Sequence, residues 1–427
     1  MKESAMTAHV TAGTPSGSSP DHDRRHVTSH APGDAASTNG AALTNGTAAA
    51  TEPALFADAT APADAEVPAG AATPADEQAT ASATEPSLLT DAGEPRRAGA
   101  LPTRRSVRRF WIVAGTLVVL AAAAICGGLA YDNPMPVGSR GFWLIAQMRA
   151  TNVVVVIVVA FCQALATVAF QTVTNNRILT PSIMGFESLY RLVQTAAVFF
   201  LGAAGVTAVV GVWQFFLQVA LMVGFAAALY GWLLAGRNGN LQVTLLVGIV
   251  MGGGLGAAAT FMQRLLTPSE FDILTARLIG SIANADTSYL GWAICLAAVA
   301  GVLLWLQAGR LNVMSLGRET AVNLGLNHRL QTICVLLLVS VLMAVSTALV
   351  GPMTFLGFLV AMLAYQLADT YDHRLVFPIA WLIGIVVLAG SHFILKHVFY
   401  AEGSVGIIIE IIGGTFFLVY ILRKGRL

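Results

Sequence analysis

Three ionisable side chains stand inside the long apolar stretches of this sequence, and they limit the chemistry that its interior can perform. Glu187 and Arg191 are four residues apart, a spacing that places both on one face of a helix. We interpret them as a self-neutralising pair, which lowers the cost of holding two charges in an apolar setting. Glu410 stands alone in the last apolar stretch. An unpaired carboxylate there predicts contact with a packing partner or with a water-filled passage, and both alternatives stay open.

The patterns that mark enzymes are absent from the apolar part of the sequence. It contains no HExxH, no Gly-x-Ser-x-Gly and no GxxxxGK[ST] phosphate loop, so we expect no catalytic residue, no metal site and no ATP hydrolysis on this chain. The four cysteines (Cys126, Cys162, Cys295 and Cys334) support neither a disulfide framework nor a CxxC metal site. The sequence therefore predicts a protein that is not an enzyme.

A ridge of small residues recurs at every fourth position in one apolar stretch. It consists of Gly248, Gly252, Gly256 and Thr260. Small residues at this spacing let two helices approach closely, which is one interpretation of the ridge. The other is that this face borders a translocation path, and we keep both.

The elements that must position these residues are apolar helices. Of the 427 residues, 56% are hydrophobic and 11% charged, and the mean hydropathy is +0.70. Apolar runs of about 20 residues have the length that crosses a hydrocarbon core, and uninterrupted runs favour helices over the alternating pattern of a barrel. We predict an all-α, polytopic membrane protein with about ten transmembrane helices, at about 110–131, 149–172, 180–203, 209–235, 241–267, 289–309, 329–350, 353–370, 375–398 and 404–423.

The N-terminal quarter of the chain has a different composition. Residues 1–109 are rich in Ala, Thr and Pro and nearly lack large apolar side chains, so we predict a disordered acidic tail followed by a permease-like membrane domain over 110–427. The formal charge of +1 is a cancellation, because residues 1–95 carry −10 and the remainder carries +11.

Basic residues between the apolar runs predict the orientation. With the N-terminus in the cytoplasm, 15 Lys and Arg residues fall on the cytoplasmic side and five on the outer side. Cytoplasmic loops carry the excess of such residues, so we expect both termini in the cytoplasm.

The longest cytoplasmic loop covers residues 311–327. Its spacing of Ser315-Leu316-Gly317, Ala321 and Leu324-Gly325 predicts apolar residues on one side of a short helix that lies across a helical hairpin. Such a helix docks on a membrane surface or on a partner protein.

The same loop resembles that of the FecCD-type permeases, the membrane subunits of ABC importers for iron–siderophore complexes and cobalamin. The shared pattern is Leu-Asn-x-x-Ser-Leu-Gly-x-x-x-Ala-x-x-Leu-Gly, beginning at Leu311. The resemblance covers about 110–427 and extends to further positions, namely Gln171, Asn176, Pro181, Gly185, Gly351, Pro352, Phe355, Gly357, Gly406, Gly413, Phe416 and Phe417.

This resemblance implies a fold of ten helices and a division of labour among subunits. Ser315, Leu316, Gly317, Ala321, Leu324 and Gly325 would couple the chain to an ATPase, and ATP and Mg would be bound there and not here. The expected partners are a second, homologous permease, two ATPase subunits and a substrate-binding protein, in the bacterial cytoplasmic membrane. Arg149 and Lys396 are candidates for gripping acidic residues of the binding protein, and Gly248, Gly252, Gly256 and Glu410 for the translocation path.

The sequence departs from the family pattern at several positions. Tyr365 stands where the family commonly has Arg, Asn175-Asn176-Arg177 replaces Arg-Asn-Pro, and Asn152 replaces a second outward arginine. The segment from Thr180 to Phe186 is closer to one siderophore-permease branch than to the cobalamin branch. We therefore expect ferric siderophores as cargo, with cobalamin or haem as alternatives and a gradient-driven secondary transporter as the competing class.

Overall fold

The computed structural model is helical throughout its described part, which comprises residues 99–101, 103–131, 134–136, 138–208, 211–235, 241–282, 285, 287–400 and 403–424. Most of the predicted disordered tail lies outside these residues. The elements are α1 (Arg104–Ala130), α2 (Arg140–Thr174), the 3-10 helix η1 (Pro181–Met184), α3 (Phe186–Ala208), α4 (Val212–Ala235), α5 (Leu241–Gln263), α6 (Pro268–Leu278), α7 (Leu290–Leu306), α8 (Ala308–Met314), α9 (Arg318–Asn323), α10 (His328–Val350), α11 (Thr354–Ala368), α12 (His373–His397) and α13 (Val405–Lys424).

The predicted all-α membrane fold is confirmed. Within the described residues, six helices are long and apolar enough to cross a membrane (α1, α2, α4, α5, α10 and α12), and α7 with α8 makes a seventh if this pair, bent by 57°, is one span. α11 and the Val405–Val419 part of α13 are shorter apolar helices. Each predicted run overlaps one helix or the bent pair.

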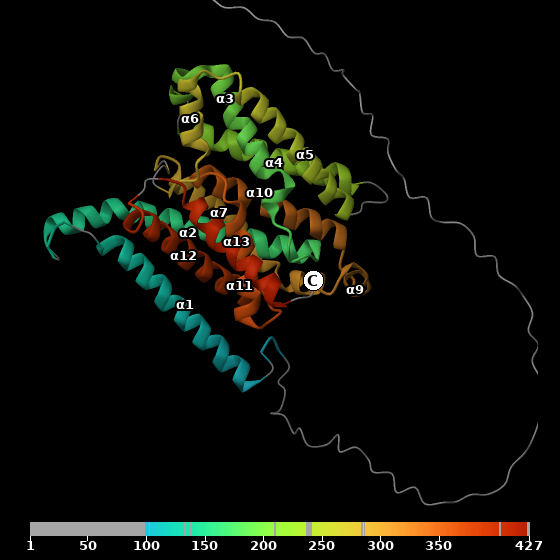
Figure 1. Cartoon of the computed structure of the whole chain (residues 1–427). Coiled ribbons are helices and arrows are strands. Elements are labelled where there is room, and N and C mark those ends of the chain that lie inside the picture. The colour runs from blue at the N-terminus through green and yellow to red at the C-terminus, as the bar shows by residue number, and fades with distance from the viewer. Residues whose placement is uncertain are drawn as a thin grey trace, which may run out of the picture. The chain divides into compact units, whose positions relative to one another are not determined.

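The long helix α2 forms the centre of the fold. Its 35 residues extend over about 52 Å, longer than a hydrocarbon core of about 30 Å. Nearly every side chain from Val155 to Val173 is buried. α2 packs against α7, α10, α11 and α12, while α3, α4, α5 and α6 form a second group that α10 joins to it (Figure 1). This burial explains why α2 is apolar around its whole circumference.

α1 packs on the outside of the first group, mainly against α12 (Figure 1). It buries three residues (Phe110, Leu117 and Ala121) and leaves Trp111 and Val119 each 67% exposed. Exposed apolar side chains on a spanning helix are suited to lipid tails. α1 begins at Arg104, before the expected boundary at residue 110, because Thr103 and Ser106 form a capping box there.

The predicted helix over 180–203 is wrong at its start. Residues 181–184 form η1, and Gly185 follows with a φ of +93°, a left-handed conformation that favours glycine. α3 begins only at Phe186. Pro181 opens η1, and the left-handed Gly185 separates η1 from α3, so the chain enters α3 through a break.

The helix α6 was not among the predicted elements. Pro268 stands in its first turn, and Glu270 accepts from the backbone N–H of Thr267 at 3.0 Å and from its hydroxyl at 2.8 Å. This Thr-Pro-Ser-Glu arrangement is a capping box, which marks the start of a helix. α6 and α9 lie at opposite ends of the bundle (Figure 1).

Candidate coupling, docking and path sites

The predicted coupling loop folds into two short helices, α8 and α9, joined by Ser315–Gly317. Gly317 and Gly325 have φ angles of +96° and +83°. Residues with side chains are strained in this left-handed region, so glycine permits both turns. The two turns reverse the chain on either side of α9, which is six residues long.

The apolar residues of this loop do not share one side, contrary to the prediction. Ala321 is fully buried, whereas Leu316 and Leu324 are 59% and 62% exposed. The physical reason is that Leu316 lies before α9 and Leu324 caps its end, so helical spacing does not relate them. With Val322 they leave an exposed apolar surface, which we call the coupling surface, next to the charged residues Arg318 and Glu319. Such a surface fits contact with another protein.

The glycine ridge of α5 packs against η1 and the start of α3. A Cβ on Gly252 would lie 2.8 Å from Cα of Gly185, and one on Gly248 would lie 3.0 Å from Cε of Met184. Gly256 faces Ser188, whose Oγ would be 3.6 Å from an added Cβ. Close packing is therefore what the ridge does within this chain, and a role beside a path stays a prediction.

The opposite face of α5 is uncovered. Gly253, Gly254, Ala257 and Ala258 are exposed there, and a Cβ on either glycine would meet nothing within 4 Å. Small side chains on an uncovered face allow another helix or a large ligand to come close to the backbone.

Glu187 and Glu410 differ in their surroundings. Glu187 is 9% exposed, and its Oε2 accepts a hydrogen bond of 2.7 Å from the hydroxyl of Thr354 in α11. Arg191 is exposed and forms no close ion pair with Glu187 among the described residues, although its charge acts on that carboxyl as the predicted pair implies. Glu410 is exposed on α13, beside the exposed Ile407 and Ile411. Its charge is nevertheless close enough to act on the carboxyl of Glu187.

The structure brings together Arg149 and Lys396, the two residues predicted to grip a binding protein. Both line one cavity of about 40 Å³ between α1, α2 and α12, with Asn152, His392 and His397. Arg149 donates from Nη1 to the carbonyl of Tyr131 at 2.7 Å, which fixes its direction. Two cations in one cavity favour an acidic contact.

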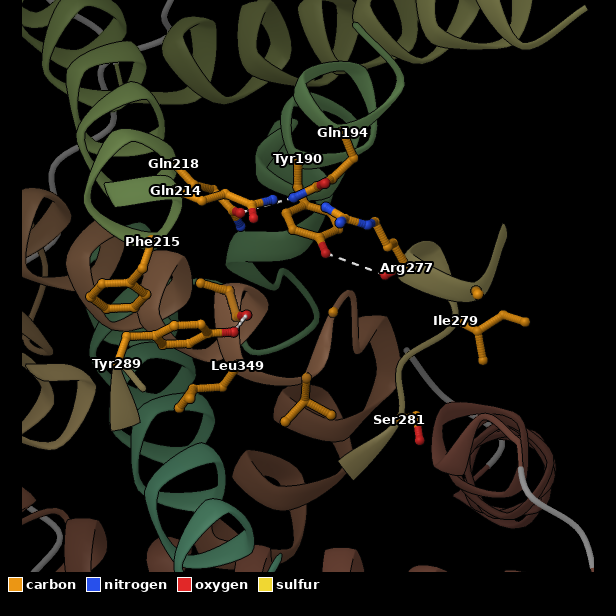
Figure 2. A pocket seen from close by; sticks show the side chains of 14 residues that line it. Tyr190, Gln194, Gln214, Phe215, Gln218, Arg277, Ile279, Ser281, Tyr289 and Leu349 are labelled. Atoms are coloured by element: carbon orange, nitrogen blue, oxygen red, sulfur yellow. Dashed lines mark hydrogen bonds between the residues drawn. The ribbon is translucent and has the colours of Figure 1, made fainter. Parts of the chain in front are cut away.

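A larger polar cavity was not predicted. It has a volume of about 260 Å³ and lies between α3, α4, the end of α6, the following segment and the end of α10 (Figure 2). Its polar lining consists of Tyr190, Gln194, Gln214, Gln218, Arg277, Ser281 and Tyr289.

Hydrogen bonds order this cavity. Gln194 Nε2 donates to Gln218 Oε1 at 2.9 Å, and the hydroxyl of Tyr190 donates to the carbonyl of Arg277 at 3.3 Å (Figure 2). Tyr289 stacks on Phe215 with ring centroids 4.9 Å apart. Burial lowers the pKa of the Arg277 guanidinium from its ordinary value. Polar residues four apart in otherwise apolar runs (190 and 194, 214 and 218) were the sequence signal for this site.

The polar cavity and the coupling surface lie at opposite ends of α10. This helix begins at His328, just after α9, and ends at Val350, which lines the cavity. Its 23 residues separate the two sites by about 34 Å, the depth of a membrane. The chain therefore has an exposed apolar surface at one end of α10 and a polar cavity at the other.

Comparison with known proteins decides the family. The FecCD transport family matches residues 133–424. The chain belongs to the FecCD transport family. It is 47% identical to the petrobactin import system permease FatC of Bacillus anthracis over 334 residues, 78% of this chain and 94% of that protein. It is 37% identical to the petrobactin import permease YclO of Bacillus subtilis, covering 72% of this chain and 97% of that protein.

The fold of this FecCD chain is similar to that of a solved structure. An inward-facing metal-chelate type ABC transporter matches with a TM-score of 0.64 at 21% identity, covering 74% of this chain and 99% of that chain. Membership of the family makes this protein a multi-pass permease subunit of an ABC importer in the cytoplasmic membrane. Such a subunit is not itself catalytic and belongs to a system with ATPase and binding-protein partners.

Two of the departures from the FecCD pattern contact each other. The guanidinium carbon of Arg177 lies 4.8 Å from the ring centroid of Tyr365, a cation–π distance. Arg177 stands where the family has Pro and Tyr365 where it has Arg. In this chain the loop after α2 supplies a cation here, and α11 supplies its aromatic partner.

Proposed function

We propose that this FecCD permease carries ferric siderophore complexes into the cell. The observation that carries the proposal is the 47% identity to a petrobactin import permease over 94% of that protein, together with a second petrobactin permease at 37%. The hemin and vitamin B12 permeases that it resembles are 29% and 27% identical. Small changes in a path lined by small residues alter cargo preference, so the more similar relatives are the better guides.

The energy would come from ATP and Mg bound to two separate ATPase subunits. The coupling surface of Leu316, Val322 and Leu324 would dock on one of them, with Gly317 and Gly325 holding the backbone turns around Ala321. Closure of the ATPases on ATP would pull this segment, and the transmembrane helices would rock between outward and inward openings. Both termini would lie on the same, cytoplasmic side as this surface.

A second permease, homologous but of different sequence, would complete the path. The exposed small-residue face of α5 and the exposed Glu410 of α13 support this arrangement, because both lack cover within the described chain. We accordingly place the path on Gly253, Gly254 and Glu410, with Gly248, Gly252 and Gly256 supporting it from behind. At the outer end, Arg149 and Lys396 would hold acidic side chains of the binding protein.

The proposal is tested by purifying the tagged chain with its native partners and examining the cargo of the binding protein. We expect an ATPase with a phosphate loop, a second FecCD chain and a binding protein that takes a ferric siderophore in a fluorescence titration. A binding protein that instead prefers cobalamin or haem would overturn the cargo. Transport by the purified chain alone, without nucleotide, would overturn the ATP-driven class.

A further inference from the structure

A buried histidine at the start of α12 has polar partners in two other helices. His373 is 3% exposed. Its Nε2 lies 2.6 Å from Oγ1 of Thr172 in α2, and its Nδ1 lies 2.6 Å from Oδ1 of Asn312 in α8. The backbone N–H of His373 donates to the same Asn312 oxygen at 3.0 Å. One side chain thus joins α2, α8 and α12.

The orientation of Asn312 determines how the imidazole is protonated. Nδ2 of Asn312 donates to Oδ1 of Asp372 at 2.9 Å, so its Oδ1 is the acceptor that faces the ring. Nδ1 of His373 must therefore carry a proton and donate it. In the neutral ring Nε2 then accepts the single hydroxyl proton of Thr172, in place of the alternative acceptor, the carbonyl of Val168 at 2.9 Å.

This cluster connects directly to the coupling segment. The hydroxyl of Ser315 donates to the carbonyl of Asn312 at 2.7 Å, and α8 ends at Met314, immediately before the turn to α9. The same carboxylate of Asp372 that holds Asn312 also accepts from the backbone N–H of Arg374 at 3.0 Å and so caps α12. Hydrogen bonds therefore connect Ser315, Asn312 and His373 without interruption.

A second set of hydrogen bonds connects the α8 region to α10 and not to α2 or α12. Arg310 donates to Gln331 at 3.3 Å, and Gln331 donates to Gln307, so this connection reaches α10. The connection through His373 is the one that reaches α2 and α12, which pack against each other along the first group. Any displacement of α8 is passed to that group through a buried, directional contact and not only through apolar packing.

We propose that His373 is a positioning residue for energy coupling, which fixes α8 and the coupling segment against α2 and α12. The proposal rests on the proposed docking of this segment on an ATPase. When the ATPases move the segment, the His373 contacts make α2 and α12 follow. Without them, α8 stays hydrogen-bonded to α12 through Asp372 and the backbone N–H of residue 373, but its polar connection to α2 is lost and part of its movement is not passed on.

Three substitutions separate the two contacts of the ring. The amide of Asn overlays Nδ1 of histidine, that of Gln overlays Nε2, and Leu replaces neither. The backbone N–H of residue 373 and the carboxylate of Asp372 hold Asn312 in every variant, so α8 stays joined to α12. His373→Gln should also keep the contact with Thr172 of α2, whereas His373→Asn and His373→Leu should lose it. In the complete complex in proteoliposomes, His373→Leu should lower transported chelate per ATP hydrolysed about fivefold, the factor for one net hydrogen bond. His373→Asn should be similarly impaired, and His373→Gln should remain closer to the unmodified complex.

A matched control removes a buried hydrogen bond that does not reach α8. Gln163 of α2 donates to Ser346 of α10 at 3.0 Å, and Ser346→Ala deletes that bond. This variant should change the yield of complex but not the transport per ATP. A proportional fall of both rates in His373→Leu, as in a merely less stable complex, would overturn the proposal.

A second readout is independent of the cargo. Addition of the binding protein should raise ATP hydrolysis by the unmodified complex, and His373→Leu should lose this stimulation while basal hydrolysis persists. Full stimulation in His373→Leu contradicts the positioning role. Absence of ferric siderophore uptake by the unmodified complex contradicts the proposed cargo alone, because the stimulation is still measured.

Discussion

At the scale of the residue, the role of a side chain depends more on its backbone conformation and contacts than on its residue type. The motif positions Gly317 and Gly325 were visible in the sequence, and the reason for glycine there is a left-handed backbone. The sequence pattern could not show that Ala321 is buried while Leu316 and Leu324 are exposed, because that depends on where α9 begins and ends. It also assigned no role to Asn312, which is part of the pattern.

Replacement of both turn glycines tests the coupling segment. Gly317→Val with Gly325→Val forces two β-branched residues into the left-handed region, at roughly 1–2 kcal/mol each. We expect uptake to be abolished while docking of the binding protein, measured by pull-down, stays intact. Gly309→Ala is the control, since Gly309 is helical and exposed with open space for a Cβ. Normal iron-limited growth of the double variant would refute the assignment.

The Arg177–Tyr365 contact predicts measurable coupling between two substitutions. Arg177→Ala and Tyr365→Leu should each destabilise the chain, and the double variant should lose about 1 kcal/mol less than the sum, the worth of a partly buried cation–π contact. Thermal unfolding of the four purified proteins gives this cycle. Strictly additive effects would show that the two side chains do not interact.

At the scale of the element, apolar runs predicted the helices and missed their interruptions. Pro181 and Gly185 are the sequence signals for the break at η1, and Thr267 to Glu270 are the signal for the start of α6. A prediction based only on the length and hydropathy of apolar runs does not detect these signals. The ridge on α5 was found from spacing. The sequence could not show that this ridge packs against Gly185, because the close approach of two backbones depends on the tertiary structure.

Substitutions at two neighbouring glycines of α5 distinguish a role in helix packing from a role in the translocation path. Gly252→Leu places a side chain against the backbone of Gly185 and should cost about 1–3 kcal/mol or more of folding free energy. Gly253→Leu points into open space, so thermal unfolding of the chain should be unaffected. Uptake should nevertheless fall if this face borders the second permease, as we propose. Unchanged uptake in Gly253→Leu would remove that face from the path.

The cap of α6 makes a pH-dependent prediction. The backbone and hydroxyl hydrogen bonds from Thr267 hold the pKa of Glu270 below its ordinary value. A lowered carboxyl pKa stabilises the folded cap above the unfolded value of about 4.3 and loses that effect as pH falls through the folded value. Protection of the first α6 amides against hydrogen exchange, relative to their intrinsic exchange rates, should therefore decrease below about pH 4.3. Glu270→Gln should abolish that pH dependence, and its persistence would contradict the cap.

At the scale of the whole molecule, the class of fold and the family were within reach of the sequence, and the sites were only partly so. Composition and apolar runs predicted a helical membrane protein, and the 311–327 pattern predicted the FecCD family. The polar cavity draws Gln194, Gln218 and Arg277 from three separate helices, so no local pattern contains it. The residues that line the complete path depend on a second subunit and stay a proposal.

ATP-dependent uptake by the reconstituted complex tests the central claim most directly. The complex is placed in proteoliposomes with the binding protein outside, and entry of a radiolabelled ferric siderophore is followed with ATP, without nucleotide, and with an ATPase-inactive partner. We predict accumulation only with ATP and an active partner, and no competition by excess cobalamin or haem. Uptake that persists without nucleotide, or that cobalamin or haem suppresses, would contradict the account.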